Sequence, residues 1–361
     1  MTISQRRQRL RERLAAAELD AMLVSDLVNV RYLSGFTGSN AALLVRVDDE
    51  TPVLATDARY RTQAARQAPD AEVVIERACG PHLVERAVAD GVRRLGFESH
   101  VITVDAHSAL SRAADGRLEL VRAPGTVEEL RMVKDAGEIA LLRLACEAAD
   151  AALTDLIERG GLRPGRTEKE VRRELESLML DHGADGPSFE TIVATGANSA
   201  IPHHRPTDAV LAAGDFVKID FGALVAGYHS DMTRTFVLAP IADWQREIYE
   251  LVATAQRAGC AALVPGTALK AVDAASRQVI ADAGYGENFG HGLGHGVGLR
   301  IHEAPGINSS AAGTLLAGSA VTVEPGVYLP DRGGVRIEDT LIVGDEAPES
   351  LTRFPKELAI V

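Results

Sequence analysis

The order of helix-like and strand-like segments changes once along this chain, near residue 125, and this change constrains the fold more than any other feature. Before it, short apolar runs typical of strands alternate with helix-like segments such as RQRLRERLAAAEL, DARYRTQAARQA and PHLVERAVADG. This alternation predicts a compact α/β domain whose sheet is partly parallel. After it, helices and antiparallel-looking strands mix without regular βαβ units, which predicts an α+β domain.

The predicted boundary lies in the turn-like run APGT, which ends at residue 126. Thr126 and Glu129 have the spacing of a capping box at the start of a long helical region that closes at Gly160 and Gly161. Further helices are predicted from about residue 167 and over 242–263 and 268–283. A length of 361 residues is typical of about two domains. We therefore predict an N-terminal α/β domain over 1–125 and a larger α+β domain over 126–361.

The composition restricts the partners of the protein. Lys and Arg number 38 and Asp and Glu number 51, so the formal charge is −13. This argues against nucleic acid or an anionic membrane as the main partner. No secretory signal and no apolar run of membrane-spanning length is visible. The three cysteines are odd in number and lack CxxC spacing, which indicates reduced thiols in a cytoplasmic protein.

The stretch FGHGLGHGVGLRIHEAPG (289–306) concentrates His291, His295 and His302 among glycines. A dinucleotide fingerprint needs G-x-G-x-x-G and a zincin needs H-E-x-x-H, and the spacing here fits neither. A single histidine is more often a turn or core residue satisfied by hydrogen bonds, and that interpretation stays open here. Because glycine lets the backbone approach a ligand closely, the cluster nevertheless indicates a site.

Four acidic residues stand in apolar, strand-like contexts: Asp220 and Asp231 in KIDFGALVAGYHSDMTRT, Glu324 in VTVEPG, and Glu338 in VRIED. A buried carboxylate is costly unless it is paired or hydrogen-bonded, and four together repel one another unless positive charge lies between them. With one imidazole they suit two divalent ions, with Mn²⁺ or Co²⁺ favoured and Zn²⁺ also compatible. For any single acid, an N-cap, a turn or a solvated strand end remains an alternative.

These motifs resemble those of a known family when they are taken in order. IDFGA, SDMTRT, GHGLGHGVGL, VEPGVY and VRIEDT resemble the catalytic motifs of the pita-bread metallopeptidases, which include aminopeptidase P, prolidase and methionine aminopeptidase. NVRYLSGFTGSN and TDARY resemble the N-terminal domain of the aminopeptidase P and prolidase branch. The resemblance covers the whole chain. It implies an α+β protein with a pita-bread catalytic domain behind a smaller, creatinase-like α/β domain.

The resemblance also implies roles for the candidate residues. Five are implied ligands of two divalent metal ions, most simply Mn²⁺, with Co²⁺ or Zn²⁺ as alternatives: Asp220, Asp231, His295, Glu324 and Glu338. Asp231 and Glu338 correspond to bridging ligands, and Glu324 is also the implied carrier of the catalytic proton. The remaining implied site residues contact the substrate or support the site: His203 and His302 as catalytic groups, and His291 and Arg336 in the substrate pocket. His204 and His229 are interpreted as neighbours without a role.

The implied activity is hydrolysis of Xaa-Pro bonds at the N-terminus of short proline-containing peptides, by hydroxide that two metals activate. Several prolidases carry an arginine where HEAPG has Gly306, which favours longer peptides here. Arg300 could supply the missing carboxylate contact, so an Xaa-Pro dipeptidase remains the alternative. A metal-free amidinohydrolase or binding module is disfavoured because all five ligand positions are present. Relatives with this N-terminal domain are often dimers, so we expect a cytoplasmic homodimer.

Overall fold

The computed structural model describes residues 1–361, which form two compact units, Met1–Arg131 and Met132–Val361. The division lies beyond the predicted boundary at residue 125, because the short helix α6 (Glu128–Arg131) is held within the first unit. Tyr32 Oη donates to the carbonyl oxygen of Leu130 (3.3 Å), and Arg131 Nη1 donates to Asn29 Oδ1 (2.8 Å). None of the helices combines the length and the hydropathy needed to cross a bilayer.

The N-terminal unit contains a six-stranded sheet in the order β4-β3-β2-β1-β5-β6. The pairs β1–β5, β5–β6 and β3–β4 are parallel, whereas β1–β2 and β2–β3 are antiparallel, so the predicted α/β unit with a partly parallel sheet is confirmed. The strands are β1 (Ala21–Val24), β2 (Ala41–Arg46), β3 (Val53–Thr56), β4 (Glu72–Ile75), β5 (Arg94–Phe97) and β6 (Glu119–Arg122). The other helical segments are α1 (Ile3–Ala16), α2 (Leu27–Ser34), η1 (Ala58–Tyr60), α3 (Arg61–Gln67), α4 (Cys79–Ala89) and α5 (Val104–Ala114).

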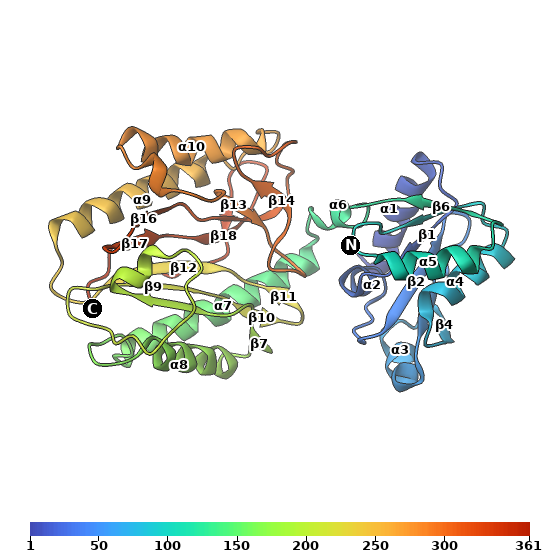
Figure 1. The fold of residues 1–361 in the computed structure, drawn as a ribbon, viewed down its shortest axis with the longest axis horizontal. Coiled ribbons are helices and arrows are strands. Elements are labelled where there is room, and N and C mark those ends of the chain that lie inside the picture. Colours follow the sequence, from blue (N-terminus) through green and yellow to red (C-terminus); the bar gives the residue numbers. More distant parts are fainter. The chain divides into compact units, whose positions relative to one another are not determined.

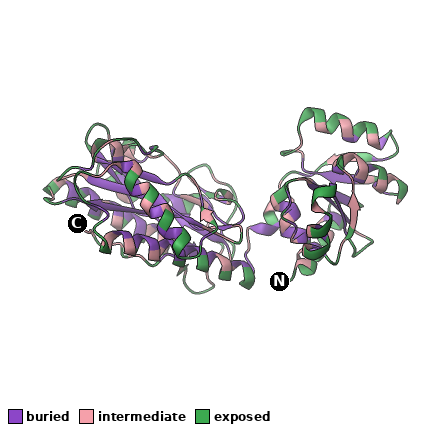
Figure 2. Cartoon of the chain, turned by 90° about the horizontal axis from the view of Figure 1, so that it is seen from below, coloured by how far each residue is buried: buried purple, intermediate pink, exposed green.

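The C-terminal unit is layered, with its strands between two pairs of helices. Figure 1 shows α7 (Ala136–Glu158) and α8 (Glu168–Asp181) on one side of the strands, and α9 (Asp243–Ala261) and α10 (Leu269–Asp282) on the other. One hydrophobic core joins α7 and α8 to the sheet β12-β9-β8, and a second joins α9 and α10 to the sheet that contains β15 and β18. The strands are therefore buried while the outer faces of the helices are exposed (Figure 2).

The strands of this unit fall into two main sheets and two small ones. The main sheets have the orders β12-β9-β8 and β14-β13-β15-β18-β19. The smaller ones are β11-β10-β7 and β16-β17. The segments are β7 (Gly186–Pro187), β8 (Ile192–Thr195), η2 (Gly196–Ala200), β9 (Phe216–Phe221), β10 (Ala223–Val225), β11 (Tyr228–His229), β12 (Met232–Val237), η3 (Gly286–Asn288), β13 (Gly294–Gly296), β14 (Glu303–Ile307), β15 (Ala320–Val323), β16 (Gly326–Leu329), β17 (Gly333–Arg336), β18 (Asp339–Ile342) and β19 (Glu349–Ser350).

The long helix predicted from residue 126 is interrupted, and the capping box predicted at Thr126 and Glu129 is wrong. Thr126 Oγ1 donates to the carbonyl oxygen of Ala123 (3.2 Å) instead. The capping box belongs to α7, where Asp135 accepts from the amide of Glu138 (3.1 Å) and Glu138 accepts from the amide of Asp135 (3.0 Å). Aspartate is among the strongest N-cap residues, and glutamate three positions later completes the motif. The other three predicted helices are present as α8, α9 and α10.

The C-terminal segment folds back onto β12. Ile360 bridges Val237 in parallel orientation, and the buried Arg234 donates from Nη2 to the carbonyl oxygen of Phe354 (2.7 Å). Arg234 and Lys356 also both pair with Asp339, whose side chain is fully buried. The last residues of the chain are thus connected to the first residue of β18.

Candidate metal centre

The four acids singled out in the sequence come to one place from different strands. Asp220 lies inside β9, opposite Thr233 of β12. Asp231 directly precedes β12, Glu324 directly follows β15, and Glu338 lies between β17 and β18. The predicted strand position is therefore correct for Asp220, whereas the other three occupy positions directly beside strand ends. At a strand end a side chain can turn toward a cavity without interrupting the pairing of the sheet.

These acids line a cavity of about 720 Å³ in the C-terminal unit, a size typical of small-molecule sites. All nine residues predicted for the site line it: His203, Asp220, Asp231, His291, His295, His302, Glu324, Arg336 and Glu338. Asp231 and Glu338 are almost completely buried, while His302 and His203 are exposed at the cavity surface. Arg300, which the sequence suggested as a carboxylate contact, does not line the cavity.

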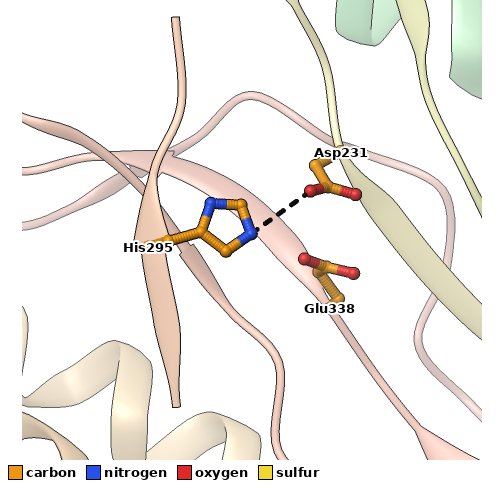
Figure 3. A group of neighbouring side chains, drawn as sticks. All are labelled: Asp231, His295 and Glu338. Atoms are coloured by element: carbon orange, nitrogen blue, oxygen red, sulfur yellow. Dashed lines mark ion pairs between the residues drawn. The ribbon is translucent and has the colours of Figure 1, made fainter. Parts of the chain in front are cut away.

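The protonation state of His295 suits metal binding. Its Nδ1 lies 3.0 Å from the carbonyl oxygen of Gly296, and a carbonyl can only accept, so Nδ1 carries the proton. The lone pair on Nε2 then faces Asp231 Oδ2 at 3.5 Å (Figure 3) and Glu324 Oε1 at 3.4 Å. Burial lowers the pKa of His295 to about 4, which keeps the ring neutral. Three electron-rich atoms that face one another repel unless a proton or a metal cation lies between them.

The carboxylates of the cluster repel one another. Burial raises the pKa of Asp231 well above its usual range, and the charge of Glu338 raises it further. Burial and the charge of Glu324 act in the same way on the pKa of Glu338. Burial raises the pKa of Glu324 to about 8, against the opposing effect of Arg336. These acids therefore hold their protons more tightly than ordinary carboxyl groups do, unless another cation replaces the protons.

Arg336 is the one buried cation among the acids, and its hydrogen bonds are already taken. It pairs with Asp220 through Nη2, donates to Tyr328 Oη (2.8 Å) through Nη1 and donates to Thr233 Oγ1 (3.0 Å) through Nε. The second carboxylate oxygen of Asp220 is buried and has no hydrogen-bond partner. The site therefore has more acceptors than donors, and its oxygens and single imidazole nitrogen fit divalent cations. The ligand atoms of Asp231, His295 and Glu338 all lie within 4.8 Å of one another.

The histidines around the cluster differ in what they offer to a bound molecule. The His302 ring packs edge-on against His295 with centroids 4.4 Å apart, and burial lowers its pKa, so it is neutral near pH 7. Both nitrogens of His291 are occupied, Nδ1 by the carbonyl oxygen of Gly292 and Nε2 by Tyr328 Oη, each at 2.8 Å. His291 therefore contributes the shape of the cavity, whereas His302 retains polar atoms for a ligand.

The glycines between the histidines are required by packing between strands. A Cβ at Gly294 would lie 2.1 Å from the carbonyl oxygen of Thr322, and one at Gly296 would lie 2.2 Å from that of Ala304. Glycine at these two positions lets β13 fit between β14 and β15 and brings His295 to the acids. From the sequence we expected these glycines to let the backbone approach a ligand closely. In the structure, the close approach is largely to the neighbouring backbone.

Sequence reasoning missed Glu168 and the role of His204. Glu168 is fully buried at the start of α8, and its carboxylate accepts five hydrogen bonds from the loop 195–207. The donors are the Thr195 amide, Asn198 Nδ2, His204 Nε2, and the amide and hydroxyl of Thr207, at 2.8–2.9 Å. His204 is thus a structural anchor next to His203. The run TEKE (167–170) indicates only where a helix begins. No feature of the sequence indicates that Glu168 contacts His204, 36 residues further along the chain.

The fold and the site together define a hydrolase with a carboxylate-rich metal centre. Residues 140–345 match metallopeptidase family M24, and residues 6–133 match the Creatinase/Prolidase N-terminal domain. The chain belongs to metallopeptidase family M24, and its C-terminal unit has the pita-bread fold of that family.

Three related proteins are similar to nearly the whole chain. An Xaa-Pro dipeptidase of Pyrococcus horikoshii is 34% identical over 340 residues, which cover 94% of this chain and 94% of the relative. The solved structure of an Xaa-Pro dipeptidase from Bacillus anthracis is similar with a TM-score of 0.95 at 40% identity, and covers 100% of both chains. An X-Pro aminopeptidase from Thermotoga maritima has a TM-score of 0.88 at 34% identity and covers 97% of this chain and 99% of its own.

Proposed function

We propose that this protein hydrolyses Xaa-Pro peptide bonds in short peptides at a centre of two divalent metal ions. The observation that carries the proposal is the unprotonated Nε2 of His295, which faces the buried carboxylate of Asp231 and the partly buried carboxylate of Glu324 in a cluster of four acids. The proposed ligands are those predicted from the sequence: Asp220, Asp231, His295, Glu324 and Glu338. Asp231 and Glu338 are the proposed bridges, and they are also the most deeply buried of the four acids.

Divalent ions held by these side chains would make a water molecule nucleophilic near neutral pH and polarise the substrate carbonyl. Glu324 is the proposed proton carrier, because its carboxylate lines the cavity and lies beside the proposed ligand nitrogen of His295, at 3.4 Å. His302 and His203 would donate to the oxygen that gains negative charge during the reaction. Arg336 holds Asp220 and Tyr328 in position and neutralises part of the acidic charge.

The substrate class rests on the relatives, because those named above act on Xaa-Pro bonds. A bond before proline is a tertiary amide without an N–H group, and general peptidases handle it poorly. The cavity offers apolar side chains that suit a proline ring, among them Phe189, Pro202 and Ile301.

Peptide length is the point on which two versions of the proposal differ. Gly306 lies opposite His295 in the β13–β14 pair, so no arginine at this position can balance a dipeptide carboxylate, which favours longer peptides. The dipeptidase alternative has stronger support from the relatives, because two of the three named above are Xaa-Pro dipeptidases. Both versions share the same centre and the same scissile bond.

The test is hydrolysis of Ala-Pro, Ala-Pro-Ala and Ala-Ala-Ala by protein loaded with Mn²⁺, with chelator-treated protein as the control. Metal-dependent cleavage before proline, with little cleavage of Ala-Ala-Ala, is the expected result. Cleavage of all three at similar rates, or none by protein that carries metal, would contradict the proposal. Manganese as the native metal, the homodimer and the cytoplasmic location remain predictions, to be checked by metal analysis, sedimentation and cell fractionation.

A further inference from the structure

The cavity is lined by two cationic side chains, Arg336 and Arg205, and they differ in what they can still bind. Arg336 is buried, and its bonds to Asp220, Tyr328, Thr233 and the carbonyl oxygen of Pro202 use four of its five N–H groups. The side chain of Arg205 is 83% exposed and forms one ion pair, from Nε to Glu190 Oε2 at 3.0 Å. Arg205 therefore retains donors for a ligand in the cavity.

The backbone that carries Arg205 is fixed although its side chain is exposed. His204 before it and Thr207 after it both donate to the fully buried Glu168, at 2.8 Å. The buried Lys218 holds the same loop from the other side by donating to the carbonyl oxygen of Ile201 (2.7 Å). A guanidinium on an anchored loop loses less conformational freedom when it binds than one on a mobile loop.

The chemistry of the cavity calls for a cation at some distance from the acids. Gly306 offers no charge to a free peptide carboxylate, and Arg336 is already paired with Asp220, so a dipeptide needs another cation in the cavity. A guanidinium binds a carboxylate through two parallel hydrogen bonds. The pair between Arg205 and Glu190 is exposed, and exposed pairs are weak, so a substrate carboxylate can replace Glu190 at little cost.

We propose that Arg205 binds the free C-terminal carboxylate of the peptide substrate, in exchange for Glu190, and so allows the enzyme to accept Xaa-Pro dipeptides. This inference rests on the proposed function and adds a residue that selects substrates by charge. It also replaces Arg300, the candidate suggested by the sequence, with an arginine that lines the cavity.

The experiment compares Ala-Pro with Ala-Pro amide, which has the same size and lacks the carboxylate charge. Arg205→Gln should lower kcat/KM for Ala-Pro about fivefold, the upper range of an exposed ion pair, and change that for the amide less than about twofold. Glu190→Gln should raise kcat/KM for Ala-Pro up to about fivefold, because it removes the competing carboxylate. Arg300→Gln is the matched control and should leave both substrates unchanged.

A second measurement does not depend on turnover. Arg205→Gln should weaken binding of the product L-proline, measured by isothermal titration calorimetry, by a factor similar to the loss in kcat/KM, and should leave binding of L-prolinamide unchanged. Equal losses on Ala-Pro and its amide, or a loss specific to Ala-Pro in Arg300→Gln, would overturn the assignment to Arg205. If the wild-type protein cleaves neither substrate when loaded with metal, the proposed function itself fails, which is a separate outcome.

Discussion

Both units of this protein bury carboxylates, but they do so in opposite ways. In the N-terminal unit, the fully buried Glu98 accepts hydrogen bonds from the amides of Ser25 and Asp26 and from Asn29 Nδ2, at 2.5–2.7 Å. In the C-terminal unit, Asp231 and Glu338 face other acids, and one oxygen of Asp220 has no partner. Glu98 thus has the hydrogen-bond donors expected around a structural carboxylate, whereas the acids of the C-terminal unit lack the donors that their charges require. A shortage of donors around buried charge is what indicates a ligand site.

The largest effect is expected on metal content, which distinguishes the acids of the C-terminal unit from Glu98. Asp231→Ala or Glu338→Ala should abolish activity and lose bound metal, because each is a proposed bridge between two ions. Glu98→Gln, the control in the other unit, should keep metal and activity. The measurement is metal analysis after dialysis together with turnover of Ala-Pro. Two metals per chain with normal turnover in either cluster variant would show that the cluster is structural like Glu98.

The next effect tests whether His295 binds metal while His302 donates a hydrogen bond to the substrate. His302→Ala should lower kcat by about 10²–10³-fold with nearly normal metal content, the scale of one lost oxyanion donor. The reason is that its ring packs against His295 without facing the carboxylates that His295 Nε2 faces. If the variant loses metal, His302 belongs with the ligands.

The fold class and a set of residues that line one cavity could be predicted from the sequence, whereas the contacts that support these residues could not. Apolar runs around Asp220 and the glycines around His295 are local signals, and they identified residues that meet in one cavity. The partners that orient them come from distant segments, such as Thr233 for Glu338 (2.7 Å) and Thr322 for the amide of His295 (3.0 Å). A threonine in a strand looks the same in sequence whether or not it faces a site.

A smaller effect concerns the pH dependence of metal-free protein. Asp231, Glu324 and Glu338 have raised pKa values in the folded state, and Glu324 reaches about 8. Between the ordinary glutamate pKa of about 4.3 and that value, the unfolded chain releases protons that the folded chain keeps. The contribution of these acids to stability therefore falls as the pH rises through this window.

Above the ordinary histidine pKa of about 6.5, the lowered pKa values of His291 and His295 no longer make stability rise with pH. We therefore expect chelated protein to lose about 1.4 kcal/mol of stability between about pH 6.5 and pH 8, the equivalent of one pKa unit. Saturating Mn²⁺ should reduce this loss, because the cations take the place of the protons. Thermal melts at the two pH values, with and without metal, measure the difference. A metal-free protein that becomes more stable toward pH 8 would contradict the repulsion among the acids.

The smallest effect is expected in the N-terminal unit. Glu98→Gln should cost about 1–2 kcal/mol of unfolding free energy, because the new amide N–H group would face Asn29 Nδ2, which is also a donor. Asn29 cannot turn its amide around, since its Oδ1 accepts from Arg131 (2.8 Å). Urea unfolding of the variant against wild-type protein checks this value. A variant as stable as the wild type would mean that Glu98 lacks the structural role assigned to it.

The attachment of the C-terminal segment to Asp339 has a practical consequence for handling the protein. Glu338 and Asp339 are neighbours in the chain, and the second is neutralised in part by Lys356 and held through Arg234 near Phe354. Shortening the chain before residue 354 would remove Lys356, one of the cations that pair with the buried carboxylate of Asp339. Asp339 directly follows Glu338, which is a proposed bridging ligand of the metal ions. Expression tags and fluorescent labels are therefore safer at the N-terminal end, where Met1 and Thr2 precede α1 in the other unit.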